Sequence, residues 1–126
     1  MTGNEYQKAA MRTYDGKAKE RMNKPIDLLN LQKEQKVFNI DIPGLINGAL
    51  GLTGEAGEVS DLLKKGIFHG KGIDMLHLKE EIGDVCWYIA LLCEAANFDL
   101  DEILAFNDNK LKERYPDGFD KNRAHL

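Results

Sequence analysis

The sequence predicts an all-α domain, a bundle of four to five helices, and three observations lead to this prediction. Apolar residues recur at spacings of three and four in several segments, which is the period of an α-helix. No segment shows the sustained apolar and polar alternation of a half-buried strand. The length of 126 residues, with 43% hydrophobic and 30% charged residues, is typical of one globular domain.

The N-terminal part, residues 1–44, is predicted to contain one helix and a connection within a single domain that spans residues 1–126. Residues 4–22 form a polar, weakly amphipathic pattern that predicts the helix. Residues 24–43 lie between two prolines and predict a connection with room for one helical piece.

The remaining segments predict three longer helices. Apolar residues at helical spacing indicate a helix over 45–65, and three glycines then predict a loop over 66–73. Asp74 is a candidate cap for the next helix, over 74–96. Asp99 and Glu102 resemble a capping pair that opens a last helix ending before Pro116.

Two acidic side chains share a face of the helix at 74–96 with apolar residues. Glu81 and Asp84 lie about 60° apart around the helix axis, and Tyr88 falls on the same side. The opposite side carries Ile82 and Cys86 among other apolar residues, so the helix is apolar on two sides, as in a buried central helix. A buried carboxylate must be neutralised, hydrogen-bonded or metal-bound.

The preceding helix repeats this arrangement with Glu55 and Glu58. Four carboxylates together would repel one another, whereas hard divalent cations with oxygen ligands make such a cluster favourable. Magnesium fits because it takes a few carboxylates and leaves other positions to water and substrate phosphates, and Mn²⁺ is an alternative. The sequence thus predicts that Glu55, Glu58, Glu81 and Asp84 form a metal site.

Simpler interpretations stay open for parts of this pattern. Any single pair of acids three residues apart is common on a solvated helix face. A di-iron bundle requires Glu-x-x-His on two helices, and only Asp74-x-x-His77 comes near that pattern. Glycines at 48, 51, 54 and 57 predict close approach by a neighbouring helix, or room for metal and phosphate beside Glu55.

The stretches GLTGEAGEVSDLLKK, KEEIGDVCWYIALLCEAANFDLDEI and NDNKLKERYPDGF resemble the MazG-like nucleotide pyrophosphohydrolases. The pattern is Glu-x-x-Glu, here Glu55 and Glu58, then the spacer 59–80, then Glu-x-x-Asp, here Glu81 and Asp84. The similarity covers roughly residues 45–120, the motif-bearing core. The resemblance implies an all-α fold and magnesium-dependent hydrolysis of a nucleoside triphosphate to monophosphate and pyrophosphate.

The resemblance also implies roles for individual residues. The four acids would be the metal ligands and catalytic residues, with Glu55 or Glu58 as a candidate to orient the attacking water. Tyr88 matches an aromatic that relatives place near the sugar or base. The other expected substrate-binding residues, mostly basic side chains for the phosphates, are Lys65, Asn107, Lys110, Arg114 and Tyr115.

Charge and composition limit the expected partners. The net charge of −4 argues against a nucleic-acid polymer as partner, and the absence of an apolar run long enough for a membrane span or a signal sequence predicts a cytoplasmic protein. Relatives form homodimers or homotetramers, so a homo-oligomer that acts on non-standard or deoxynucleotides is expected. The alternatives are a phosphoribosyl-ATP pyrophosphohydrolase or dUTPase activity, and a non-catalytic helical module that binds metal or a partner.

Overall fold

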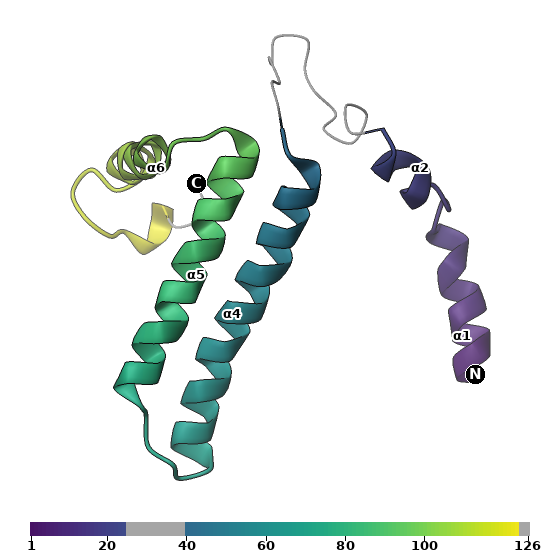
Figure 1. Ribbon diagram of the computed structural model, residues 1–126, viewed down its shortest axis with the longest axis horizontal. Helices are drawn as coiled ribbons and strands as arrows, with labels where there is room; N and C mark the ends of the chain where they lie inside the picture. The colour runs from purple at the N-terminus through teal and green to yellow at the C-terminus, as the bar shows by residue number, and fades with distance from the viewer. Residues whose placement is uncertain (25–39, 124–126) are drawn as a thin grey trace. The chain divides into compact units, whose positions relative to one another are not determined.

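The structure is a computed structural model that describes residues 1–24 and 40–123. All regular structure in these residues is helical, so the predicted all-α class is confirmed (Figure 1). The described residues form two compact units, 1–24 and 40–123, and most of the predicted connection over 24–43 lies outside the described residues. The α-helices are α1 (Gly3–Ala10), α2 (Ala18–Met22), α4 (Ile42–Phe68), α5 (Met75–Ala96) and α6 (Leu100–Arg114), with short 3-10 turns at Met11–Thr13 and Lys121–Arg123. In the described part of the chain, no helix is long and apolar enough to cross a membrane.

The N-terminal unit contains two short helices where one helix over 4–22 was predicted, so that prediction is wrong. α1 begins with a capping box, in which the Thr2 hydroxyl accepts from the Glu5 N–H at 3.1 Å and the Glu5 carboxylate accepts from the Thr2 N–H at 2.6 Å. The chain leaves the helical path before α2, where Gly16 has a φ of +70°. A left-handed residue of this kind ends a helix.

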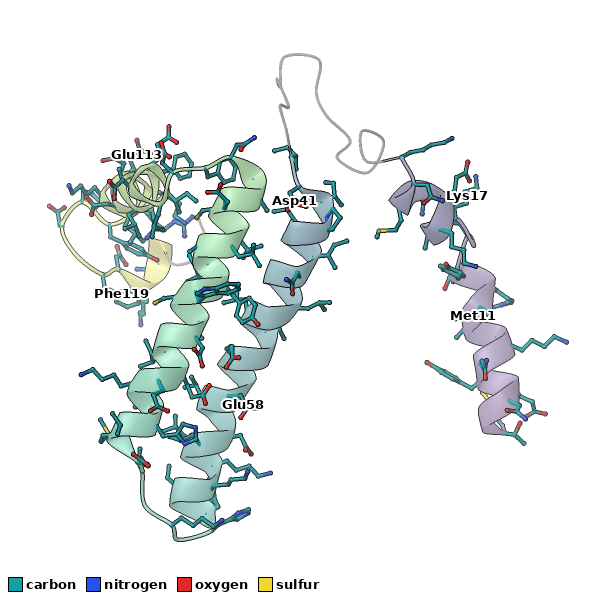
Figure 2. All side chains as sticks on the ribbon, in the orientation of Figure 1. Met11, Lys17, Asp41, Glu58, Glu113 and Phe119 are labelled. Carbon is teal, nitrogen blue, oxygen red and sulfur yellow. The ribbon has the colours of Figure 1, made fainter. Side chains whose placement is uncertain are left out.

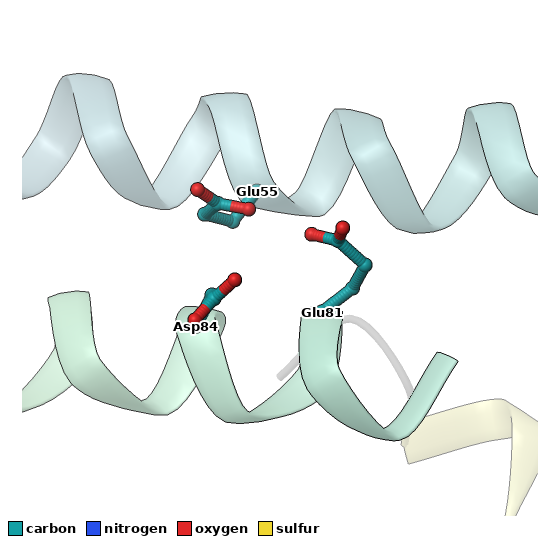
Figure 3. Close-up of side chains that lie close together, drawn as sticks. All are labelled: Glu55, Glu81 and Asp84. Carbon is teal, nitrogen blue, oxygen red and sulfur yellow. The ribbon is translucent and has the colours of Figure 1, made fainter. Parts of the chain in front are cut away.

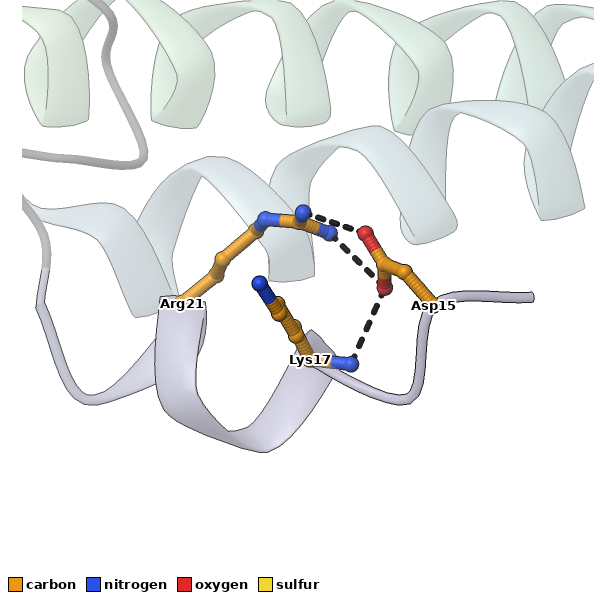
Figure 4. A network of polar contacts seen from close by, with 3 residues as sticks. All are labelled: Asp15, Lys17 and Arg21. Atoms are coloured by element: carbon orange, nitrogen blue, oxygen red, sulfur yellow. Dashed lines mark hydrogen bonds and ion pairs between the residues drawn. The ribbon is translucent and has the colours of Figure 1, made fainter.

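Asp15 fixes the turn between these helices (Figure 4). Its carboxylate accepts from the Lys17 N–H at 3.0 Å and forms a two-pronged ion pair with Arg21 of α2. The hydrogen bonds from Arg21 are the main reason that the pKa of Asp15 lies below its ordinary value.

In the second unit, α4 and α5 form an antiparallel hairpin and pack side by side along their lengths (Figure 1). Asp41 caps α4 by accepting from the Gly44 N–H at 2.9 Å, and its own N–H donates to the Ala95 carbonyl of α5 at 2.9 Å. At the other end of the hairpin, the Gly72 N–H donates to the Gly66 carbonyl at 3.0 Å. Backbone hydrogen bonds therefore join the start of α4 to the end of α5, and the end of α4 to the loop that leads into α5.

Glycines on α4 allow this close packing. A Cβ added at Gly48 would lie 2.8 Å from the Leu92 side chain, and one added at Gly51 would lie 2.1 Å from the Tyr88 ring. A Cβ at Gly54 or Gly57 would meet no atom of the structure within 4 Å. The predicted close approach is therefore confirmed for the first two glycines and not for the last two.

Both ends of α4 and the cap of α6 differ from the predictions, and α4 begins at Ile42 instead of residue 45. α4 continues to Phe68, so residues 66–68 are helical and the loop begins at His69. Gly66 stays helical because it is buried against the Gly72 backbone, where a Cβ would lie 2.7 Å from the carbonyl oxygen. α6 begins after Asp99 as predicted, but the Asp99 side chain makes no capping hydrogen bond, so the predicted capping pair is wrong.

The hairpin leaves apolar side chains exposed. Figure 2 draws the side chains along α4 and α5. On α5, Cys93 and Ala95 are buried, whereas Ile82 is 51% exposed and Cys86 is exposed. The expectation of a central helix buried on two sides is therefore not met, because Ile82 and Cys86 are exposed although they share a side of α5 with the buried Cys93. On α4, Leu50 is 70% exposed.

Candidate metal centre

Three carboxylates meet where the middle of α4 faces α5 (Figure 3). Glu55 projects from α4, and Glu81 and Asp84 project from adjacent turns of α5 toward it. One oxygen atom from each side chain lies within 4.8 Å of the other two. The predicted convergence of acids from two helices is thus present for these three residues, which we call the acidic cluster.

The acidic cluster is electrostatically strained without a cation. The neighbouring Glu81 carboxylate, which can accept the proton of a protonated Glu55, is the largest cause that raises the pKa of Glu55. Partial burial and the charges of Asp84, Glu81 and Glu58 act in the same direction. The Glu81 Oε2 atom is buried and has no hydrogen-bond donor in the described structure. Unpaired buried oxygen atoms of this kind are costly unless they bind a cation.

His77 lies one turn before Glu81 on α5, and its Nε2 atom is 2.9 Å from Glu81 Oε1. The Glu81 side chain is 12% exposed and the His77 side chain is 51% exposed. The backbone N–H of His77 donates to the capping Asp74 carboxylate at 3.1 Å. One Glu81 oxygen is therefore hydrogen-bonded within the protein, and the other is not.

The residues of the acidic cluster fit a hard divalent cation. All three ligands offer carboxylate oxygens, which suit Mg²⁺ or Mn²⁺ better than softer metals. The cluster carries several negative charges in a small volume, and the buried Glu81 Oε2 lacks a donor. A cation would offset these charges and would also give the Glu81 Oε2 atom a binding partner.

Glu58, the fourth predicted acid, stands apart from the acidic cluster. It is exposed and lines a hollow of about 250 Å³ near the α4–α5 loop, together with Asp61, Lys65, Lys71 and His77 among others. Lys65 is part of the same hollow, but its Nζ atom pairs with Asp61 on the preceding turn at 2.7 Å. Two predicted site residues, Glu58 and Lys65, thus share this neighbouring hollow.

Tyr88 lies beside the acidic cluster, as the helix projection predicted. Glu55, Asp84, Trp87 and Tyr88 line a second hollow of about 370 Å³. The Trp87 and Tyr88 rings meet edge to face, with centroids 5.0 Å apart, and Trp87 is 60% exposed. The hollow therefore combines acidic oxygens with two aromatic surfaces.

The predicted phosphate-binding residues near the C-terminus are on a different helix from the acids. Asn107, Lys110 and Arg114 lie along α6, and Tyr115 follows its last residue. Asp84 lies twelve residues before the end of α5, which is about 18 Å along the helix axis. The connection to α6 therefore begins well away from the acidic cluster.

Sequence reasoning missed two residues that the structure places at these hollows. Trp87 lies on the flank of the acidic face, three residues after Asp84, and it lines the hollow with Glu55. His77 was considered only as half of an incomplete di-iron motif. Its spacing of four residues before Glu81 is the signal that could have identified it, because side chains at i and i+4 are neighbours on a helix.

Comparison with known proteins agrees with this geometry. A profile of the MazG nucleotide pyrophosphohydrolase domain matches residues 47–119, which is more than half of the chain and includes all four acids. The chain is 36% identical over 77 residues to the Gene 37 protein of Mycobacterium phage L5, covering 58% of this chain and 68% of that protein. No solved structure matches with significance. The chain belongs to the MazG nucleotide pyrophosphohydrolase family.

Proposed function

We propose that this protein is a magnesium-dependent pyrophosphohydrolase that converts a nucleoside triphosphate and water to a monophosphate and pyrophosphate. The observation that carries this proposal is the acidic cluster, in which oxygens of Glu55, Glu81 and Asp84 lie within 4.8 Å of one another. Membership of the MazG family supports the same reaction class. We propose that its substrates are non-standard nucleotides or deoxynucleotides of the cytoplasmic pool.

The acidic cluster would hold the cation, with Mn²⁺ as an alternative to Mg²⁺. When bound, the ion offsets the charge of the substrate phosphates and lowers the pKa of a coordinated water. Glu58 is exposed, one turn along α4 from Glu55 and outside the acidic cluster. We therefore assign Glu58 the role of orienting the attacking water and accepting its proton.

The other predicted residues would bind the substrate. Tyr88 and the hollow that it lines with Glu55 and Asp84 offer a surface for the sugar or base. Lys65 lies in the hollow with Glu58, close enough to meet phosphates once its pairing with Asp61 opens. Asn107, Lys110, Arg114 and Tyr115 would bind phosphates from α6 or the residue after it.

A panel of nucleoside triphosphates with Mg²⁺ tests the proposed reaction. We expect equal amounts of monophosphate and pyrophosphate, measured by chromatography and a pyrophosphate assay, and no product with chelator. The panel includes dUTP, and phosphoribosyl-ATP is assayed in parallel, because the preferred substrate distinguishes the proposed activity from a dUTPase or a phosphoribosyl-ATP pyrophosphohydrolase. Folded protein that releases no pyrophosphate from any of them would contradict the proposal.

Two matched variants separate metal binding from catalysis. Glu81→Gln should lower both Mg²⁺ affinity and turnover, because it removes a charged ligand from the acidic cluster. Glu58→Gln should lower turnover by about 100-fold or more, the usual contribution of a general base, and keep most of the metal affinity. Equal loss of metal affinity in both variants would place Glu58 among the ligands instead.

A further inference from the structure

The geometry points to His77 as a positioning residue that fixes the Glu81 carboxylate for the cation. This inference rests on the metal site proposed above, and it concerns a residue outside the Glu-x-x-Glu and Glu-x-x-Asp motifs. Its basis is the contact of 2.9 Å between His77 Nε2 and Glu81 Oε1. Because an ionised carboxylate only accepts hydrogen bonds, Nε2 carries the hydrogen in this contact.

This hydrogen bond makes the two oxygens of Glu81 unequal. Oε1 is occupied by His77, whereas Oε2 is buried and has no donor in the described residues. A Glu side chain has three rotatable bonds, and without a hydrogen-bond partner its carboxylate can turn about the last of them. With Oε1 held by the imidazole, Oε2 remains available to the cation in one orientation.

The position of His77 itself is also fixed. It lies in the first turn of α5, and its backbone N–H donates to the Asp74 carboxylate that caps the helix, at 3.1 Å. The start of the helix thus fixes the backbone position from which the imidazole reaches Glu81, and the imidazole in turn holds Glu81 Oε1. Hydrogen-bond partners of metal ligands commonly change metal affinity by 10–100-fold.

A merely structural role is the competing interpretation. His77 and Glu81 are an i, i+4 pair, and such pairs stabilise a helix by a few tenths of a kcal/mol without any metal. Under that interpretation, substitution of His77 would change stability but leave metal affinity unaltered. Metal affinity is therefore the measurement that separates the two roles.

Three substitutions at residue 77 test the geometry by isothermal titration with MnCl₂ at one fixed pH. His77→Gln places an amide nitrogen near the position of Nε2 and should keep most of the affinity. His77→Asn carries the same amide on a shorter chain that does not reach Glu81, and His77→Ala removes it. Both substitutions should raise the Mn²⁺ dissociation constant by about 10–100-fold. Circular dichroism checks that each variant is folded.

Lys112→Ala is the matched control, because Lys112 and Asp108 form another i, i+4 pair, 2.8 Å apart, on α6. It should leave Mn²⁺ affinity unchanged. Equal affinity of wild type, His77→Asn and His77→Ala would overturn the inference, as would equal loss in the Gln and Asn variants. Absence of Mn²⁺ binding to the wild type would overturn the metal site itself, so the two failures are distinguishable.

Discussion

Glu55 faces two acids of the opposite helix, and this placement links its ionisation to the stability of the protein. The neighbouring Glu81 carboxylate, which can accept its proton, and the nearby negative charges raise the pKa of Glu55 above the ordinary value of 4.5. In the metal-free protein, the folded state therefore keeps this proton to higher pH than the unfolded state does. Stability contributed by the protonated group is present below the ordinary value and lost as pH rises through the raised one.

We expect the urea midpoint of the metal-free protein to decrease as the pH rises above the ordinary pKa of 4.5, because of this ionisation. Glu55→Gln cannot ionise and should remove that part of the fall. Saturating Mg²⁺ should also reduce it, since a cation compensates the charges. Unfolding curves in urea with chelator, and then with Mg²⁺, measure both effects.

Glu80→Gln is the control for this experiment, because Glu80 is an exposed acid on the same helix and lies outside the acidic cluster. It should keep the pH dependence of the wild type. The attribution to Glu55 would be wrong if Glu80→Gln and Glu55→Gln flattened the profile equally.

Residue spacing predicted that four acids converge, and the structure brings three of them together. The i, i+3 spacing placed Glu81 and Asp84 on one face, and both join the acidic cluster. Glu58 has the same spacing from Glu55, yet it lines another hollow. A helical projection gives the angle around the axis, whereas the shift of one helix along the other decides which turns face each other. Cross-helix contacts such as the Asp41 to Ala95 hydrogen bond determine that shift.

At the scale of the helix, some glycines of α4 contact α5 closely and others face open space, and alanine substitutions should have opposite effects on stability at the two kinds of position. Gly48→Ala should destabilise the protein by about 1–3 kcal/mol through overpacking, partly offset by better helix propensity, since its Cβ would lie 2.8 Å from Leu92. Gly57→Ala is the matched control and should stabilise by about 0.8–1 kcal/mol, because its Cβ meets open space. Urea unfolding of both variants gives the two signs, and a shift in the same direction would contradict this packing.

The boundaries of the helices show where local sequence signals compete. Gly66 was predicted to end α4, but close contact with Gly72 keeps it helical, and this contact is not visible in the sequence. The break before α2 had a readable signal in Asp15 and Gly16, a common turn pair that the helical pattern on either side outweighed. Tertiary contacts explain the first difference and local turn chemistry explains the second.

For the whole molecule, the exposed apolar side chains of the hairpin favour self-association. Leu50 on α4 and Ile82 on α5 are 70% and 51% exposed. We propose a homodimer or homotetramer, with a mass of two or four times the 14.2 kDa of the chain. Analytical ultracentrifugation over a range of protein concentrations measures this mass. A mass of 14.2 kDa at every concentration would contradict the proposal.

The sequence predicted the all-α class and the two long helices because their apolar residues repeat over many turns. It could not predict the division of the described residues into units 1–24 and 40–123. Such a division depends on which surfaces meet, and the polar pattern of residues 4–22 carries little information about a partner surface. The single domain over 1–126 therefore stays a prediction.

Trp87 has a practical consequence that follows from its position. It is the sole tryptophan of the chain, it is 60% exposed, and it lines the hollow with Glu55 and Asp84. Indole fluorescence shifts to shorter wavelengths when water is excluded from the ring, and a stacked base quenches it. The tryptophan emission of the protein therefore originates from one place, so the chain carries a built-in optical probe of this hollow that needs no added label.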